Sequence, residues 1–222
     1  MPDPTPFNAA RARLTEDLQA MSYQVEEQLA TAIAALKDRN PALARVVLER
    51  EHAINEFENR IEAEGLQLLA RFQPVAGDLR LIIMALKIST DLERIGDHAV
   101  NIAQRAVTLA AQPQLKPLID IPLMAERAGK MLKGAVDAFT RRDANGARVI
   151  LEEDRVIDEL RTQIFRELLT YMAADPGAIE RAMQLILVAK DLERIADLAT
   201  NIAEDVIFVV DGRIVRHGAD AG

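Results

Sequence analysis

Apolar side chains follow the three-and-four-residue spacing of an α-helix along most of the chain, and no segment sustains the two-residue alternation of a half-buried strand. Proline marks the ends of these periodic segments. The dipeptides Asn40-Pro41 and Asp175-Pro176 place a capping side chain before a proline, which opens a helix, whereas Gln73-Pro74 ends one. The pattern predicts six long helices, over residues 8–38, 41–72, 76–110, 123–141, 144–174 and 177–210.

Three prolines fall between residues 111 and 122, a stretch without helical periodicity that we expect to be a linker. This linker divides the chain into two domains, residues 1–110 and 123–222, and each domain holds three of the predicted helices. The tail beyond Asp211 and Gly212 is expected to be irregular at its end.

The two halves of the chain repeat one another. A shift of 103 residues places the first two helices of one half on those of the other, and Leu29, for example, falls on Leu132. In the third helix the shift is 100 residues, and ten of the thirteen positions in 91–103 are identical to those in 191–203. Because the identical positions include charged ones, we predict an all-α fold of two tandem three-helix bundles related by an internal repeat.

Acidic and amide side chains recur at a four-residue spacing on the third helix of each half. Four residues turn a helix by about 40° beyond one full turn, so these side chains form one stripe. Like charges at this spacing destabilise an isolated helix by roughly 0.2–0.5 kcal/mol, a cost that something must compensate. The stripes are Glu93, Asp97 and Asn101 in the first half and Glu193, Asp197 and Asn201 in the second.

The second helices carry matching pairs, which are Asp154 with Asp158 and, at the equivalent positions, Glu51 with Asn55. Helices two and three of an antiparallel three-helix unit are neighbours, so each half can gather four or five oxygen ligands of the kind that hard cations and iron accept. The chain has no cysteine, which excludes thiolate ligands. We expect iron, zinc, manganese or magnesium, and we expect the better site in the second half because Asn55 replaces a carboxylate in the first.

The composition narrows the class of function. The net charge of −8 argues against nucleic-acid binding, which needs a basic stripe. Residues 1–6 have neither the basic nor the apolar region of a leader peptide. The longest apolar run, residues 81–86, is far shorter than the roughly 20 residues of a membrane span. We therefore expect a soluble, cytoplasmic protein.

No catalytic constellation stands out, so we expect neither enzymatic activity nor catalytic residues. Glu49 and His52 have the Glu-x-x-His spacing of di-iron bundles, but Arg155 replaces the second histidine, which disfavours a carboxylate-bridged metalloenzyme. His98 points about 100° away from Asp97 around the helix and is interpreted as a surface or rim residue. A simpler interpretation of the stripes is a metal-independent helical adaptor whose acidic faces dock basic partner surfaces.

Three segments carry a family resemblance. Residues 73–80, which read Gln-Pro-Val-Ala-Gly-Asp-Leu-Arg, and residues 91–103 together resemble the signature of the PhoU family. Residues 191–203 resemble the repeat of that signature, and residues 211–217 resemble the end of the family's domain. The resemblance covers nearly the whole chain.

The resemblance implies two tandem three-helix bundles with pseudo-twofold symmetry. It also implies multinuclear metal clusters on Glu/Asp-x-x-x-Asp motifs, with Asn101 and Asn201 as additional ligands and with Asn55 departing from the motif. It further implies a regulator that restrains phosphate uptake and phosphate-starvation signalling by coupling the ATPase of a phosphate ABC transporter to a sensor histidine kinase. Homodimers are common in the family, so a homodimer is expected.

Overall fold

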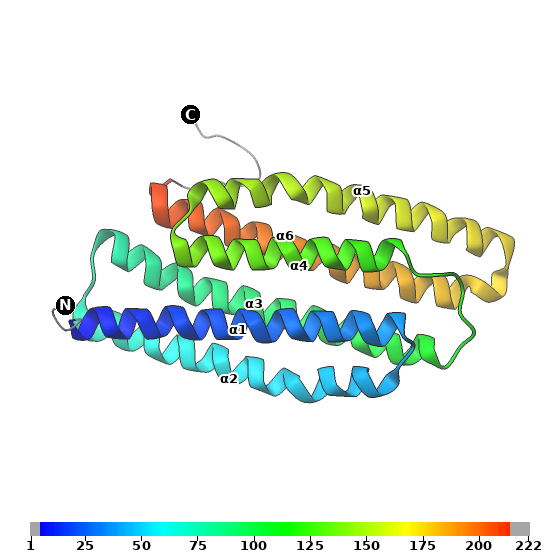
Figure 1. Ribbon diagram of the computed structural model, residues 1–222, viewed down its shortest axis with the longest axis horizontal. Helices are drawn as coiled ribbons and strands as arrows, with labels where there is room; N and C mark the ends of the chain where they lie inside the picture. The colour runs from blue at the N-terminus through cyan, green and yellow to red at the C-terminus, as the bar shows by residue number, and fades with distance from the viewer. Residues whose placement is uncertain (1–4, 214–222) are drawn as a thin grey trace.

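The computed structural model describes residues 5–213, and within them the chain forms six long helices and one short 3-10 turn, with no strand (Figure 1). The predicted all-α class is therefore confirmed. Residues 214–217, which belong to the closing segment singled out above, lie outside the described part of the chain. The helices are α1 (Pro6–Lys37), α2 (Pro41–Phe72), α3 (Ala76–Ala110), α4 (Asp120–Arg141), α5 (Ala144–Ala174) and α6 (Ile179–Asp211), with η1 (Pro176–Ala178) before α6.

Capping side chains begin the helices where the sequence indicates. The Oδ1 atom of Asn40 accepts a hydrogen bond from the backbone N–H of Ala42 at 3.0 Å, and Asp143, its counterpart in the second half, accepts from the N–H groups of Asn145 and Gly146. These carboxylate and amide oxygens pair with N–H groups that the first turn leaves without a helical partner. At the end of α2, Gln73 adopts a left-handed conformation, with φ of 47°, and stops the helix before Pro74.

The start of α4 differs from the prediction. The sequence assigned Pro122 to the linker, but the helix begins at Asp120 and includes that proline in its first turn. A proline is tolerated there because the N–H that it lacks would have no helical partner. The linker therefore ends at Ile119 rather than at residue 122.

The linker is held to both halves of the chain. Arg39, in the turn between α1 and α2, donates hydrogen bonds to the carbonyl oxygens of Ala110 and Gln112. Lys116, which is buried, forms an ion pair with Glu167 on α5. Because a buried ammonium requires a nearby negative charge, this pair holds the linker against the second half.

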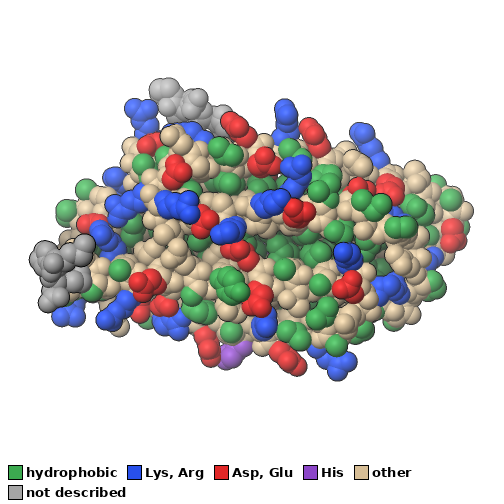
Figure 2. Space-filling model, in the orientation of Figure 1, with side chains coloured by type: hydrophobic (Ala, Val, Ile, Leu, Met, Phe, Trp, Pro, Cys, Tyr) green, Lys and Arg blue, Asp and Glu red, His purple; other side chains and the backbone are tan. Residues whose placement is uncertain are grey.

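Each half is a three-helix bundle, and we call α1–α3 the first repeat and α4–α6 the second repeat. The repeats meet along a seam where α3 packs against α6 and α1 packs against α4 (Figure 1). The side chains buried in this two-repeat core are mainly alanine, leucine, isoleucine and valine. On the face shown in Figure 2, acidic and basic side chains are interspersed along the helices. Among residues 5–213, no helix has the length and apolarity needed to cross a bilayer.

Three buried carboxylates, Asp91, Asp191 and Asp205, lie along α3 and α6. Asp191 of α6 contacts two side chains of α3, the Nδ1 atom of His98 at 3.0 Å and the Nε atom of Arg105 at 3.2 Å. His98, predicted at the surface or rim, is thus a half-buried residue of the seam, 23% exposed.

On the other side of the seam the charges are arranged differently. Lys87 of α3 donates a 2.6 Å hydrogen bond to Asp205 of α6, and Arg94 lies 3.6 Å from Asp91. Burial raises the pKa of Asp91 to about 6; Lys87 lowers this pKa, and the nearby Asp205 raises it further. Lys87 therefore contributes positive charge to two neighbouring carboxylates between the repeats.

This arrangement predicts that Lys87→Met destabilises the fold by about 2 kcal/mol, because the substitution removes the ammonium from a carboxylate that is 91% buried. The matched control is Lys130→Met on α4. Lys130 makes an ion pair of the same 2.6 Å length with Glu126, but both side chains are more than 60% exposed. The control should change the free energy of unfolding by less than about 0.5 kcal/mol. Urea denaturation measures both variants, and equal losses would contradict the role given to the seam.

Candidate functional site

The ten candidate ligand residues lie on two equivalent faces of the molecule. The face of the first repeat is formed by α2 and α3, and the face of the second repeat is formed by α5 and α6, which pack side by side as the repeat predicted. The candidates are half-buried or exposed, and none lies in the core. The candidates of the first repeat, which define its acidic face, are Glu51 and Asn55 on α2 with Glu93, Asp97 and Asn101 on α3; those of the second are Asp154 and Asp158 on α5 with Glu193, Asp197 and Asn201 on α6.

The carboxylates of the second repeat are close enough to repel one another. Burial raises the pKa of Asp154, and the charges of Asp158, Asp197 and Glu193 raise it further. Asp154 and Asp158 belong to α5, whereas Glu193 and Asp197 belong to α6. The fold has therefore brought together the four carboxylates that the sequence proposed for this face.

The first repeat shows the same effect with one additional residue. Burial raises the pKa of Glu93, and the charges of Asp97, Glu58 and Glu51 add to the effect while Arg94 opposes it. Glu58 lies on α2 and was not among the predicted ligands. The shift of 103 residues places Glu58 on Arg161, and Glu58 lies outside the four-residue spacing of Glu51 and Asn55, so neither the repeat nor the spacing indicated it.

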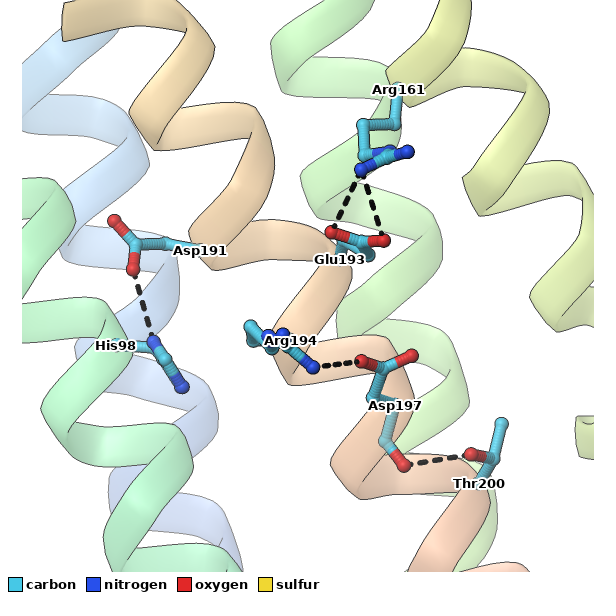
Figure 3. A network of polar contacts seen from close by, with 7 residues as sticks. All are labelled: His98, Arg161, Asp191, Glu193, Arg194, Asp197 and Thr200. Atoms are coloured by element: carbon cyan, nitrogen blue, oxygen red, sulfur yellow. Dashed lines mark hydrogen bonds and ion pairs between the residues drawn. The ribbon is translucent and has the colours of Figure 1, made fainter.

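Arginine side chains already occupy two carboxylates of the second repeat (Figure 3). The Nη1 atom of Arg161 on α5 lies 3.3 Å from Oε1 and 3.4 Å from Oε2 of Glu193. Arg194 donates a hydrogen bond of 3.1 Å to Oδ2 of Asp197. A cation that binds both carboxylates would have to displace these guanidinium groups or share the carboxylate oxygens with them.

The donor set suits a hard cation, but the side chains do not converge on one point. Within residues 5–213, no group of three or more histidine or acidic side chains is placed to hold a single metal ion. Carboxylates whose pKa values are raised by their neighbours nevertheless favour a nearby positive charge, because such a charge relieves their repulsion. Metal binding at these faces would require rotation of the carboxylate side chains.

The two faces differ in a way that the sequence prediction did not include. The second face was expected to be the better site because Asn55 replaces a carboxylate in the first. The structure adds Glu58 to the first face and places Arg161 on Glu193 in the second. The added negative charge of Glu58 and the Arg161–Glu193 ion pair both favour the first face for a cation, opposite to the order expected from the sequence. The ranking of the two faces stays a prediction.

The crowding of carboxylates predicts that Asp154→Asn raises the free energy of unfolding of the metal-free protein by about 0.5 kcal/mol, because one of four repelling charges is removed. The same change should weaken metal binding. Glu152→Gln, an exposed position on the same helix, is the control and should change neither quantity. Chemical denaturation and metal titration of the three proteins test this. A destabilised Asp154→Asn variant would show that these carboxylates do not repel one another.

The sequence of the chain is similar to that of a known protein family. The family model described as the PhoU domain matches the chain twice, at residues 18–106 and 121–206. The phosphate-specific transport system accessory protein PhoU homolog of Pseudomonas aeruginosa is 42% identical over 212 residues, which are 95% of this chain and 88% of that protein. The homolog of the same name from Aquifex aeolicus is 43% identical over 202 residues, 91% of each chain.

Solved structures agree with the sequence matches. The crystal structure of PhoU from Pseudomonas aeruginosa superposes with a TM-score of 0.90 at 41% identity, covering 93% of this chain and all of the other. The phosphate transport system regulatory protein PhoU from Streptococcus pneumoniae gives a TM-score of 0.88 at 26% identity, with 95% of this chain covered and all of the other. The family model matches the chain twice, two relatives exceed 40% identity, and the six-helix architecture is shared. This chain therefore belongs to the PhoU family.

Proposed function

We propose that this chain is a regulatory accessory protein of a phosphate-specific transport system. The observation that carries the proposal is its identity of 42% with an accessory protein of such a system along 95% of the chain. The regulatory protein from Streptococcus pneumoniae, whose fold matches at a TM-score of 0.88, supports the same role. In this proposal the chain is a regulator rather than an enzyme. It lies in the cytoplasm and reaches the membrane only by binding the transporter.

The acidic faces are proposed to bind metal ions, with iron, zinc, manganese or magnesium as candidates. Carboxylates from two helices lie near one another in each repeat, and burial together with the charges of these neighbours raises the pKa values of Glu93 and Asp154. A bound multivalent cation would supply the positive charge that this crowding favours, and it would join α2 to α3 and α5 to α6. Metal-dependent rigidity of the two faces would then set how the chain contacts its partners.

The partners proposed for the adaptor are the ATPase of the phosphate transporter and a sensor histidine kinase. The similar proteins of Pseudomonas aeruginosa and Aquifex aeolicus are accessory proteins of phosphate-specific transport systems, which supports association with transport components. The kinase and the homodimer follow from the family resemblance. In this proposal the chain restrains phosphate uptake and phosphate-starvation signalling by contacting both partners.

A second candidate function is a metal-independent adaptor. The ion pairs of Arg161 with Glu193 and of Arg194 with Asp197 favour it, because they show that guanidinium groups can satisfy these carboxylates. An arginine-rich partner surface would then dock on the acidic faces. Salt would weaken such docking steeply and chelation would leave it unchanged, whereas metal-dependent docking responds to chelation.

The metal proposal predicts that the double variant Glu193→Ala with Asp197→Ala loses part of its bound metal after loading and dialysis. The loss should be partial because the first repeat keeps its own acidic face. A control removes two exposed carboxylates of α5, Glu152→Ala with Glu159→Ala, and should keep the metal content of the natural chain. Mass spectrometry measures the metal, and circular dichroism checks the helices. Unchanged metal content in the first variant would refute the site.

The adaptor proposal predicts that the chain co-purifies with the transporter ATPase, and that a chelator reduces the recovered complex. The comparison is made at high and at low phosphate, since a regulator of uptake should bind differently in the two conditions. Retention that resists chelator and falls with salt would favour the metal-independent adaptor. Absence of the ATPase in both phosphate conditions would contradict the partner assignment.

A further inference from the structure

A cleft lies between α5 and α6 in the second repeat, on the side of the acidic face where Arg161 stands. Its volume is about 360 Å³. This size lies near the lower end of the range for small-molecule sites, roughly 300–1,000 Å³. The residues lining it are Arg161, Thr162, Phe165, Ile186, Ala189 and Lys190.

The lining combines an apolar wall with positive charge. Phe165, which is 46% exposed, stands on α5 opposite the apolar side chains of Ile186 and Ala189 on α6. Arg161 and Lys190 bring two cations to the same cleft in a chain whose net charge is −8. An apolar wall beside a guanidinium and an ammonium fits a ligand that carries an anionic group on an apolar body.

Arg161 belongs to the cleft and to the acidic face at once. It lines the cleft, and its Nη1 atom lies 3.3 Å from Glu193 (Figure 3). The charge of Glu193 offsets that of Arg161, so it weakens the attraction of the cleft for an anion. If the charge of Glu193 were neutralised, the guanidinium of Arg161 would attract an anion in the cleft more strongly. By linkage, an anion bound in the cleft would equally favour binding of a cation at Glu193.

We propose that the cleft between α5 and α6 binds a small organic anion with an apolar body, and that Arg161 couples its occupancy to the charge of Glu193. Anion binding in the cleft is argued from the residues that line it and does not depend on the proposed function. Only the further step, in which metal on the acidic face promotes anion binding, rests on the proposed function. The anion and the metal would then each favour binding of the other.

The first repeat does not have this combination of side chains. At the positions equivalent to Arg161 and Phe165 it has Glu58 and Glu62, and Thr90 stands in the place of Lys190. Two carboxylates replace a guanidinium and an aromatic ring, so the equivalent surface would repel an anion. The proposed site is therefore specific to the second repeat, although both repeats share the same backbone.

The absence of tryptophan from the sequence makes a site-specific measurement possible. Phe165→Trp places a single tryptophan in the cleft, and its half-exposed position leaves room for the larger ring. The probe is 1-anilinonaphthalene-8-sulfonate, a sulfonate on an apolar aromatic body that accepts energy from tryptophan. Energy transfer reports binding near the introduced tryptophan, so dye bound at distant surfaces contributes little to the signal.

Three substitutions are then compared in this reporter chain without metal. Arg161→Gln should weaken binding of the dye at least about threefold, and Glu193→Gln should strengthen it by a similar factor, since each changes one charge at the cleft. Arg155→Gln is the matched control, because Arg155 is exposed on the same helix and pairs with Glu159 instead. It should leave the affinity unchanged. Equal affinities in the Arg161 and Arg155 variants, or the lack of energy transfer in the reporter chain, would overturn the proposal.

Manganese added to the reporter chain separates the cleft from the metal proposal. If metal binds the acidic face, manganese should strengthen dye binding as Glu193→Gln does, and it should have little further effect in the Glu193→Gln variant. If Glu193→Gln strengthens binding and manganese does not, the cleft and the role of Arg161 stand, and the metal function of this face is contradicted.

Discussion

The packing of α3 against α6 joins the two repeats, and the rest of the molecule depends on this contact. Each of these helices is covered on one side by its own bundle and on another by the opposite repeat. Because each helix is buried on two sides, its exposed polar side chains are confined to the remaining side. The Glu93–Asp97 pair lies there beside α2, and the Glu193–Asp197 pair lies there beside α5. The position of both acidic faces is thus a consequence of how the seam is filled.

Charges at the seam show how the two repeats have diverged on one backbone. Asp191 is held by His98 and Arg105, whereas the positions equivalent to these two residues in the second repeat are Leu198 and Asp205. Because Asp205 stands at the position equivalent to Arg105, it leaves two carboxylates, Asp91 and Asp205, near each other. The positive charge of Lys87 offsets their repulsion. The same kind of exchange, Glu58 for Arg161, separates the acidic face of the first repeat from that of the second.

Much of the fold was predictable because local rules decide it. Helix periodicity and the caps gave the helix ends to within three residues. Asn40 caps α2, whereas Asp175 caps the turn η1, and α6 begins at Ile179 rather than at residue 177. The difference of three residues arose at Pro122, where a first-turn proline was assigned to the linker. The grouping of carboxylates on shared faces also followed, since the repeat fixes helix order and a four-residue spacing fixes the stripe. The contacts of Arg161 and Lys87 could not be predicted. They join long, flexible side chains to residues on other helices, and the rotamers that make these contacts depend on how the helices pack.

We propose that the carboxylates of the two equivalent faces bind metal ions. The most direct measurement is anomalous X-ray scattering from crystals of this chain grown with manganese. We expect anomalous peaks at the carboxylates between α2 and α3 and between α5 and α6, with Arg161 moved away from Glu193 in the second repeat. Manganese bound elsewhere on the chain, with the Arg161–Glu193 ion pair intact and both faces empty, would contradict it.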